Sequence, residues 1–99
     1  MELNSNQRKY LRGVAHHLDP VVLIGKHGLT PTLVKAAAEA LEAHELVKVK
    51  FNDFKEQKDA LLAELSQQTG SQIAGRIGHV GILYREQPDI EKRLIELPT

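Results

Sequence analysis

The segment with the most chemical content is a short loop of two glycines, a lysine and a histidine. Gly25, Lys26, His27 and Gly28 follow four apolar residues and precede Thr30, a good first cap for a helix. Two glycines three positions apart allow a tight turn and the close approach of a ligand to the backbone. The free amides of a helix start favour a phosphate at that place. The loop therefore predicts an anion-binding site, and the alternative is a strand-to-helix turn with no further role.

Known nucleotide-binding motifs do not fit this loop. It lacks the third glycine of the dinucleotide-binding fingerprint and the Gly-Lys-Ser/Thr ending of the NTPase phosphate loop. A GxxG loop also clamps nucleotides in KH domains, but there it joins two helices, whereas this loop follows a predicted strand. The loop is therefore not assigned to any of these three classes.

A second feature is a basic stripe on the first predicted helix. Arg8, Arg12 and His16 are spaced by four and share one face, with Lys9 beside them. The alternative is that these basic side chains are simply the solvent-exposed face of the helix, opposite the side that packs on the core. The chain has zero formal net charge, yet residues 1–35 carry five Lys or Arg against two acids. Because this helix leads into the glycine loop, we expect the two to form one surface. This surface could be extended by three residues of the final hairpin, Arg76, His79 and Arg85.

Several kinds of catalytic or cofactor site are not expected. The chain has no cysteine, which excludes disulfides and thiolate chemistry. His44 and Glu45 form half of the HExxH zinc motif, but Lys48 stands where the second histidine belongs. No serine stands in a nucleophile–base arrangement, so we expect no enzyme, no metal and no cofactor. The few aromatic residues, Tyr84 among them, are expected in the core and not as stacking platforms for bases.

The elements that must position these residues follow from periodicity and caps. We predict helices over 5–18, 31–44 and from about 53 to Gly70, with Asn4 and Gln7 forming a capping box at the first. Tyr10, Leu11, Val14 and Leu18 are the expected buried stripe of that helix. The predicted strands are 21–24, 46–51, 73–77 and 80–84.

Each strand pattern predicts a different setting. The apolar run at 21–24 favours a central strand buried on both faces, whereas 46–51 alternates and leaves Lys48 and Lys50 on a wet face. The last two strands form a hairpin with a type II′ turn at Gly78 and His79. The order α-β-α-β-α-β-β implies an α/β (α+β) fold of two layers with a four-stranded mixed sheet. In the tail, Leu94, Ile95 and Leu97 are expected to dock.

Length and composition limit the class of protein. Ninety-nine residues predict one domain over 1–99. The N-terminal sequence has no basic leader followed by an apolar run, and no apolar stretch is long enough to span a bilayer. We therefore expect a cytoplasmic chain without a membrane partner. Zero net charge argues against bulk coating of nucleic acid, so a nucleic-acid role requires a localised patch.

Several motifs together resemble a known family. They are Gln7-Arg8-Lys9-Tyr10-Leu11-Arg12, the run from Pro20 through Gly25-Lys26-His27-Gly28-Leu29-Thr30, His44-Glu45-Leu46-Val47-Lys48-Val49-Lys50, and Leu83-Tyr84-Arg85. This combination resembles the CRM domain, named for chloroplast RNA splicing and ribosome maturation, and within it the bacterial stand-alone YhbY family. The resemblance covers nearly the whole chain.

The resemblance implies a fold like the C-terminal domain of translation initiation factor three and a non-enzymatic RNA-binding role. Its bacterial members associate with precursors of the large ribosomal subunit, so the implied partner is precursor large-subunit rRNA or its ribonucleoprotein. The RNA-contacting residues would be Gly25, Lys26, His27 and Gly28, supported by Arg8, Lys9 and Arg12. No small-molecule substrate is implied, and we expect a monomer. The alternative is an interaction module that binds a ribosomal protein or assembly factor through the exposed sheet face.

Overall fold

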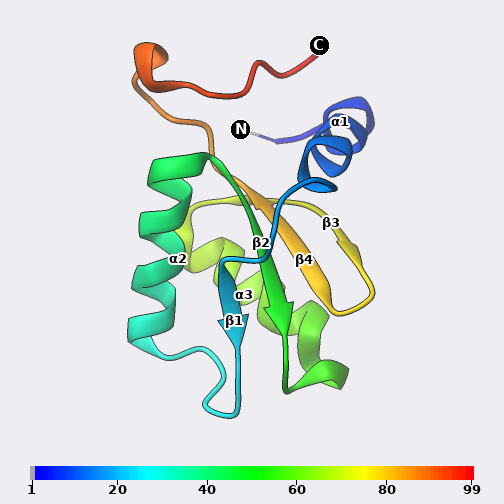
Figure 1. Ribbon diagram of the computed structural model, residues 1–99, viewed down its shortest axis with the longest axis vertical. Coiled ribbons are helices and arrows are strands. Elements are labelled where there is room, and N and C mark those ends of the chain that lie inside the picture. The colour runs from blue at the N-terminus through cyan, green and yellow to red at the C-terminus, as the bar shows by residue number, and fades with distance from the viewer. Residues whose placement is uncertain (1) are drawn as a thin grey trace.

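The computed structural model describes residues 2–99. Its elements follow the order predicted from the sequence, with two short 3-10 helices added (Figure 1). They are α1 (Ser5–Ala15), β1 (Val22–Ile24), α2 (Pro31–His44), β2 (Leu46–Phe51), η1 (Lys55–Gln57), α3 (Lys58–Thr69), β3 (Gln72–Ile77), β4 (Val80–Tyr84) and η2 (Ile90–Lys92). The predicted α-β-α-β-α-β-β order is confirmed.

The strands form one mixed sheet in the order β1-β2-β4-β3. β1 and β2 are parallel, whereas β4 lies between β2 and β3 and is antiparallel to both. The pairing places Leu23, Lys50, Val80 and Ile77 in one row across all four strands. Paired residues of neighbouring strands point to the same face of a sheet. These four side chains therefore share a face.

The first strand differs from its prediction. β1 is an edge strand that pairs only with β2, and not a central strand buried on both faces. Val22 and Ile24 are buried, whereas Leu23 is 54% exposed. An apolar run does not reveal the order of strands in a sheet, so it cannot distinguish a central strand from an edge strand with one covered face.

One face of the sheet is closed by α2 and α3. Val47, Val49 and Phe51 point to this face and are buried, as the alternation of β2 predicts. The same cluster contains Val22, Ile24, Ala37, Leu41, Leu62, Leu65 and Leu83. In Figure 1, α3 crosses behind the sheet on this side. The main core thus lies between the sheet and these two helices.

The opposite face is covered only in part, by α1. Leu11 and Ala15 of the helix pack with Leu46, Ile82 and Tyr84 of the sheet. The predicted two-layer arrangement therefore holds where the sheet is covered on one face only, by α2 and α3. Where α1 also covers the opposite face, the fold has three layers. The sequence did not reveal this because the stripe of α1 shows that the helix packs but not against which face.

The remainder of that second face is uncovered, and we call it the open face. It consists of Leu23, Lys48, Lys50, Ile77 and Val80. Lys50 is exposed and Lys48 is half-buried, so the predicted wet side of β2 is confirmed. Leu23 and Ile77 are 54% and 63% exposed, which leaves large apolar side chains in contact with solvent.

The start of α1 is capped as predicted, but the helix is shorter. The Asn4 side chain accepts a hydrogen bond from the Gln7 amide at 2.8 Å, and the Gln7 side chain accepts one from the Asn4 amide at 3.0 Å. The helix ends at Ala15 and not at Leu18, because the Leu18 amide bonds to the Ala15 carbonyl in a tighter turn before Pro20.

The buried stripe of α1 is correspondingly different from the prediction. Leu11 and Ala15 are fully buried and Val14 packs beside them. Tyr10 and Leu18 are exposed, so the predicted stripe is wrong at both of its ends. Leu18 lies beyond the end of the helix, where the helical period no longer sets its direction.

The third helix and the hairpin follow their local signals with small shifts. Asp53 and Glu56 do not begin the α-helix, because η1 intervenes and α3 starts at Lys58. Gly70 ends α3 in the left-handed conformation at φ 66°, as predicted. Gly78 has φ 59° while His79 does not have a positive φ, which fits the predicted type II′ turn.

A buried glutamate holds the C-terminal tail. Glu45 is 1% exposed and its carboxylate accepts hydrogen bonds from the amides of Gln87, Leu94 and Ile95 at 2.9, 2.6 and 3.0 Å. Ile95 and Leu97 pack against the cluster under α1, as predicted for docking residues, whereas Leu94 is exposed. The tail crosses above the sheet without forming a strand (Figure 1).

Candidate functional site

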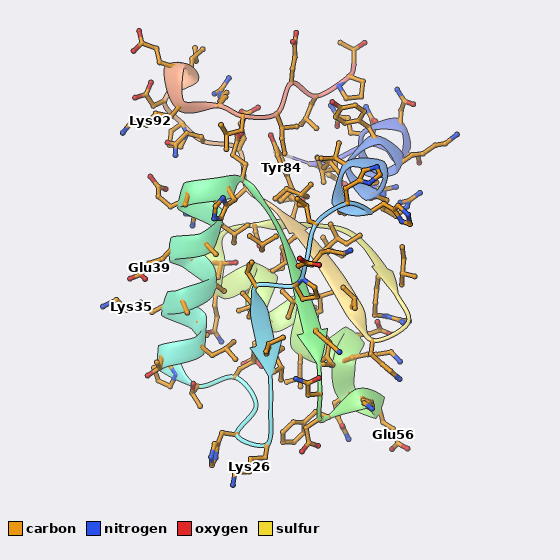
Figure 2. The ribbon with its side chains drawn as sticks, viewed as in Figure 1. Lys26, Lys35, Glu39, Glu56, Tyr84 and Lys92 are labelled. Carbon is orange, nitrogen blue, oxygen red and sulfur yellow. The ribbon has the colours of Figure 1, made fainter. Side chains whose placement is uncertain are left out.

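The glycine loop connects β1 to α2 at one end of the molecule. The Gly28 amide bonds to the Gly25 carbonyl at 3.0 Å, and Gly28 has φ 65°, a backbone conformation that L-residues adopt at a cost. Lys26 and His27 at the tip are exposed. Figure 2 shows Lys26 pointing away from the body of the protein. The loop is therefore a tight turn that presents a cation to solvent.

A second connection supports this loop from below. The amides of Asn52 and Asp53 bond to the Ile24 carbonyl at 2.9 and 3.2 Å, which ties the end of β2 to the end of β1. Phe54, in the left-handed conformation, lies against Gly28, where an added Cβ would stand 3.6 Å from its ring. Phe54 was expected in the core and instead forms the exposed base of the loop. No local sequence signal marks this role.

The start of α2 offers less to an anion than its sequence suggests. Pro31 has no amide hydrogen, the Leu33 amide bonds to the Thr30 hydroxyl at 3.1 Å, and the Val34 amide bonds to the Thr30 carbonyl at 3.0 Å. Within residues 2–99, only the Thr32 amide of this first turn has no protein partner. The Thr30 cap that defines the start of the helix therefore also accepts hydrogen bonds from most of the amides that an anion could otherwise bind.

The basic side chains of α1 differ in how far they are engaged. One guanidinium nitrogen of Arg8 donates to the Leu3 carbonyl at 2.6 Å, and Arg12 donates to the Ala74 carbonyl at 3.2 Å. Arg12 lies directly over Gly75, where a Cβ would come within 2.6 Å of its side chain. Lys9 is exposed. The two arginines thus have structural roles in addition to any role in binding.

The loop and α1 do not form one continuous surface. In Figure 1 the loop lies at one end of the longest axis and α1 lies toward the other. The open face fills the interval between them, with Lys48 and Lys50 along β2. The prediction that the loop and α1 form one surface is therefore wrong in that the two are not in direct contact. They are separated because β1 runs away from α1 before the loop begins.

The hairpin residues have separate surroundings. Arg76 forms an ion pair with Asp59 and donates to the Gly78 carbonyl, and Arg85 donates to the carbonyls of Thr69 and Ala38 at 2.9 and 3.1 Å. These two arginines are largely occupied within the protein.

His79, at the hairpin turn, has a cationic environment. It lies 3.3 Å from the Lys58 ammonium, measured from its Nδ1. Partial desolvation lowers the pKa of His79, and the positive charges of Lys58, Lys55 and Arg76 lower it further. The surrounding positive charges therefore favour the neutral form of the His79 imidazole over its cation.

Three further observations concern metal ions, membranes and aromatic stacking. No three His, Asp or Glu side chains among residues 2–99 gather in a way that could hold a metal ion. No helix of that part of the chain has the length and apolar character needed to cross a membrane. Tyr84 is fully buried, which excludes it from stacking on a ligand, and burial raises its pKa to about 12, with Glu45 and Glu86 adding to the shift.

Comparisons with known proteins agree on one family. Residues 3–85 match the CRS1 / YhbY (CRM) domain. The chain is 39% identical over 97 residues to "Probable RNA-binding protein YqeI" of Bacillus subtilis, covering 97% of this chain and 99% of that one. It is 37% identical over 97 residues to an RNA-binding protein of Haemophilus influenzae, covering 97% and 95%. The solution structure of protein SAV1595 from Staphylococcus aureus matches with a TM-score of 0.81 at 38% identity, over 97% of this chain and 99% of that one.

Proposed function

Because the chain belongs to the CRS1 / YhbY (CRM) domain family, we propose that it binds RNA and holds the RNA backbone with the β1–α2 loop. The observation that carries this proposal is the position of Lys26 and His27. Both are exposed at the tip of a tight loop, and neither has a hydrogen-bond or ion-pair partner among residues 2–99. The names of the bacterial relatives, which describe RNA-binding proteins, support the same reading.

The loop would act on the phosphates and not on the bases. The Lys26 ammonium supplies the charge, and Gly25 and Gly28 let the RNA backbone approach without a Cβ in the way. The Thr32 amide adds one donor at the helix start. Contacts of this kind position RNA but carry little sequence information, so selectivity would come from RNA shape.

The basic side chains of α1 would form a second contact. Lys9 is exposed and gives the most available charge, Arg12 keeps donors free beyond its bond to Ala74, and Arg8 contributes least because it is turned toward Leu3. Because the loop and α1 lie apart, an RNA that engages both must cross the open face (Figure 1). The zero net charge of the chain fits docking through one face in place of general coating.

We assign the RNA to precursors of the large ribosomal subunit, following the resemblance to the bacterial stand-alone members, and the protein would act there as a monomeric, non-enzymatic assembly factor. Crosslinking in cells followed by sequencing of the attached RNA tests this assignment. The expected crosslinks centre on precursor large-subunit rRNA and fall in a Lys26→Ala variant. A Lys92→Ala variant is the matched control, since Lys92 is exposed on the tail (Figure 2). Crosslinks scattered over unrelated RNAs would contradict the assignment.

A second candidate function is a protein interaction module, and the exposed Leu23 and Ile77 of the open face favour it. A protein partner bound through these side chains would show little salt dependence, and substitution of Lys48 or Lys50 would matter more than substitution of the loop. RNA binding through phosphates would instead depend strongly on salt, because counterions are released when RNA binds. Substitution of the loop would then matter more than substitution of Lys48 or Lys50.

A further inference from the structure

A small groove lies where α1 meets the open face. Its volume is about 160 Å³, and its lining combines three basic side chains with an apolar floor. The lining residues are Arg12, His16, Lys48, Ile77, Val80 and Ile82. None of these residues is acidic, and α1 itself contains no acid. The groove therefore favours a ligand that combines negative charge with an apolar body.

The two permanent cations of this groove are held in place. Arg12 is fixed by its bond to the Ala74 carbonyl and by its packing over Gly75. The Lys48 ammonium donates to the Leu18 carbonyl at 2.9 Å, just beyond the end of α1. A guanidinium has five N–H donors and an ammonium three, so each keeps donors for a ligand. Cations that are already ordered lose less entropy on binding.

The floor of the groove continues across the sheet. Ile77 and Val80 belong to the row that runs through Lys50 to Leu23 on β1. The chain after β1 leads directly to the glycine loop. An extended ligand held at the loop can therefore follow the open face to the groove.

We propose that this groove is a subsite for one unpaired nucleotide of RNA, with its base and ribose on Ile77 and Val80 and its phosphate between Arg12 and Lys48. The proposal rests on the RNA-binding function proposed above. Charge complementarity selects the occupant, because Arg12 and Lys48 supply positive charge, no lining residue is acidic, and Ile77, Val80 and Ile82 are apolar. An RNA duplex exposes phosphates but not the faces of its bases, so the subsite distinguishes single-stranded RNA from a duplex.

The test compares binding of a labelled single-stranded RNA and of a duplex by fluorescence anisotropy at several salt concentrations. Ile77→Ser removes floor area from an exposed residue and should weaken single-strand binding by about fivefold without changing the salt slope. Lys48→Gln should weaken it and flatten the slope by about one unit. Duplex binding should change little in Ile77→Ser.

A third variant tests the groove without altering charge. Gly75→Ala places a Cβ where Arg12 now lies, and the flexible Arg12 side chain must move away. Single-strand affinity should fall as it does in Arg12→Gln, although the net charge is that of the native protein. Thermal unfolding of each variant confirms that the fold is retained.

The outcomes separate the two proposals. If Ile77→Ser, Lys48→Gln and Gly75→Ala all bind single-stranded RNA like the native protein while Lys26→Ala is weakened, the subsite is overturned and the loop function stands. That result would favour the second candidate function, in which the open face binds a protein partner. If the native protein binds neither RNA, the proposed function itself is wrong and the subsite falls with it.

Discussion

The two ends of the molecule use their polar side chains in opposite ways. At the end formed by α1 and the tail, Glu45 is saturated by three backbone amides, and Arg8 is bonded to a backbone carbonyl. At the other end, Lys26 and His27 extend into solvent from a loop with a positive φ at Gly28. The comparison shows that a charged residue near a surface is available to a ligand to the extent that the fold leaves its hydrogen-bonding groups unused.

The largest expected effect comes from the saturated end. Glu45→Ala should lower the free energy of unfolding by about 3–5 kcal/mol, because one buried and two partly buried amides lose their acceptor and a buried donor without an acceptor costs about 1–3 kcal/mol. Glu45→Gln keeps an acceptor and should lose less. Urea denaturation monitored by circular dichroism measures the difference.

Glu39→Ala is the matched control for Glu45, since Glu39 is an exposed glutamate of α2, the helix that ends just before Glu45 (Figure 2). It should leave the free energy of unfolding within about 0.5 kcal/mol of the native value. If the Glu45 and Glu39 variants were equally stable, the tail would not be held by the buried carboxylate.

Alkaline pH should weaken the same end. The pKa of Tyr84 is raised to about 12 in the folded protein against 10.0 for an ordinary tyrosine, so the hydroxyl stays neutral in both states below pH 10. Between pH 10 and 12 the unfolded chain ionises first, and the free energy of unfolding should fall by up to about 2 kcal/mol. Denaturation across this pH range measures the fall.

Tyr84→Phe provides the check on that prediction. Within residues 2–99 the buried Tyr84 hydroxyl has no hydrogen-bond partner, so its removal should change stability at neutral pH by less than about 1 kcal/mol. In Tyr84→Phe the fall in the free energy of unfolding between pH 10 and 12 should be smaller than in the native protein. An identical loss in the variant would assign the pH dependence to other groups.

The loop should show a smaller effect on stability but a clear one on binding. Gly28→Ala forces a Cβ into a left-handed conformation at φ 65°, which should cost about 1–2 kcal/mol and reshape the tip that carries Lys26. Gly25→Ala is the control for stability, since its Cβ meets nothing within 4 Å and its φ is not positive. Thermal unfolding should separate the two variants, and RNA affinity should fall in Gly28→Ala. Equal unfolding temperatures would show that the loop does not need a glycine at position 28.

Local signals account for the parts of the fold that could be predicted. The Asn4 capping box, the Thr30 cap, the alternation of β2 and the glycines at 70 and 78 depend on residues a few positions apart, and each appears as predicted. Such patterns are set by backbone geometry and need no knowledge of distant contacts.

The parts that could not be predicted depend on long-range packing. The edge position of β1 follows from the order of strands, and the burial of Glu45 follows from a tail some 50 positions away. The site shows the same division. The exposed loop was found from Gly25 to Gly28, whereas its support by Phe54 and its separation from α1 required the fold.

The measurement that tests the central claim most directly is the salt dependence of RNA affinity for Lys26→Ala and Lys35→Ala. Both residues are exposed lysines, at the loop tip and on α2 (Figure 2). Lys26→Ala should weaken binding to every RNA and flatten the plot of log affinity against log salt by about one unit, whereas Lys35→Ala should match the native protein. Equal affinity and slope in the two variants would contradict RNA binding through the β1–α2 loop.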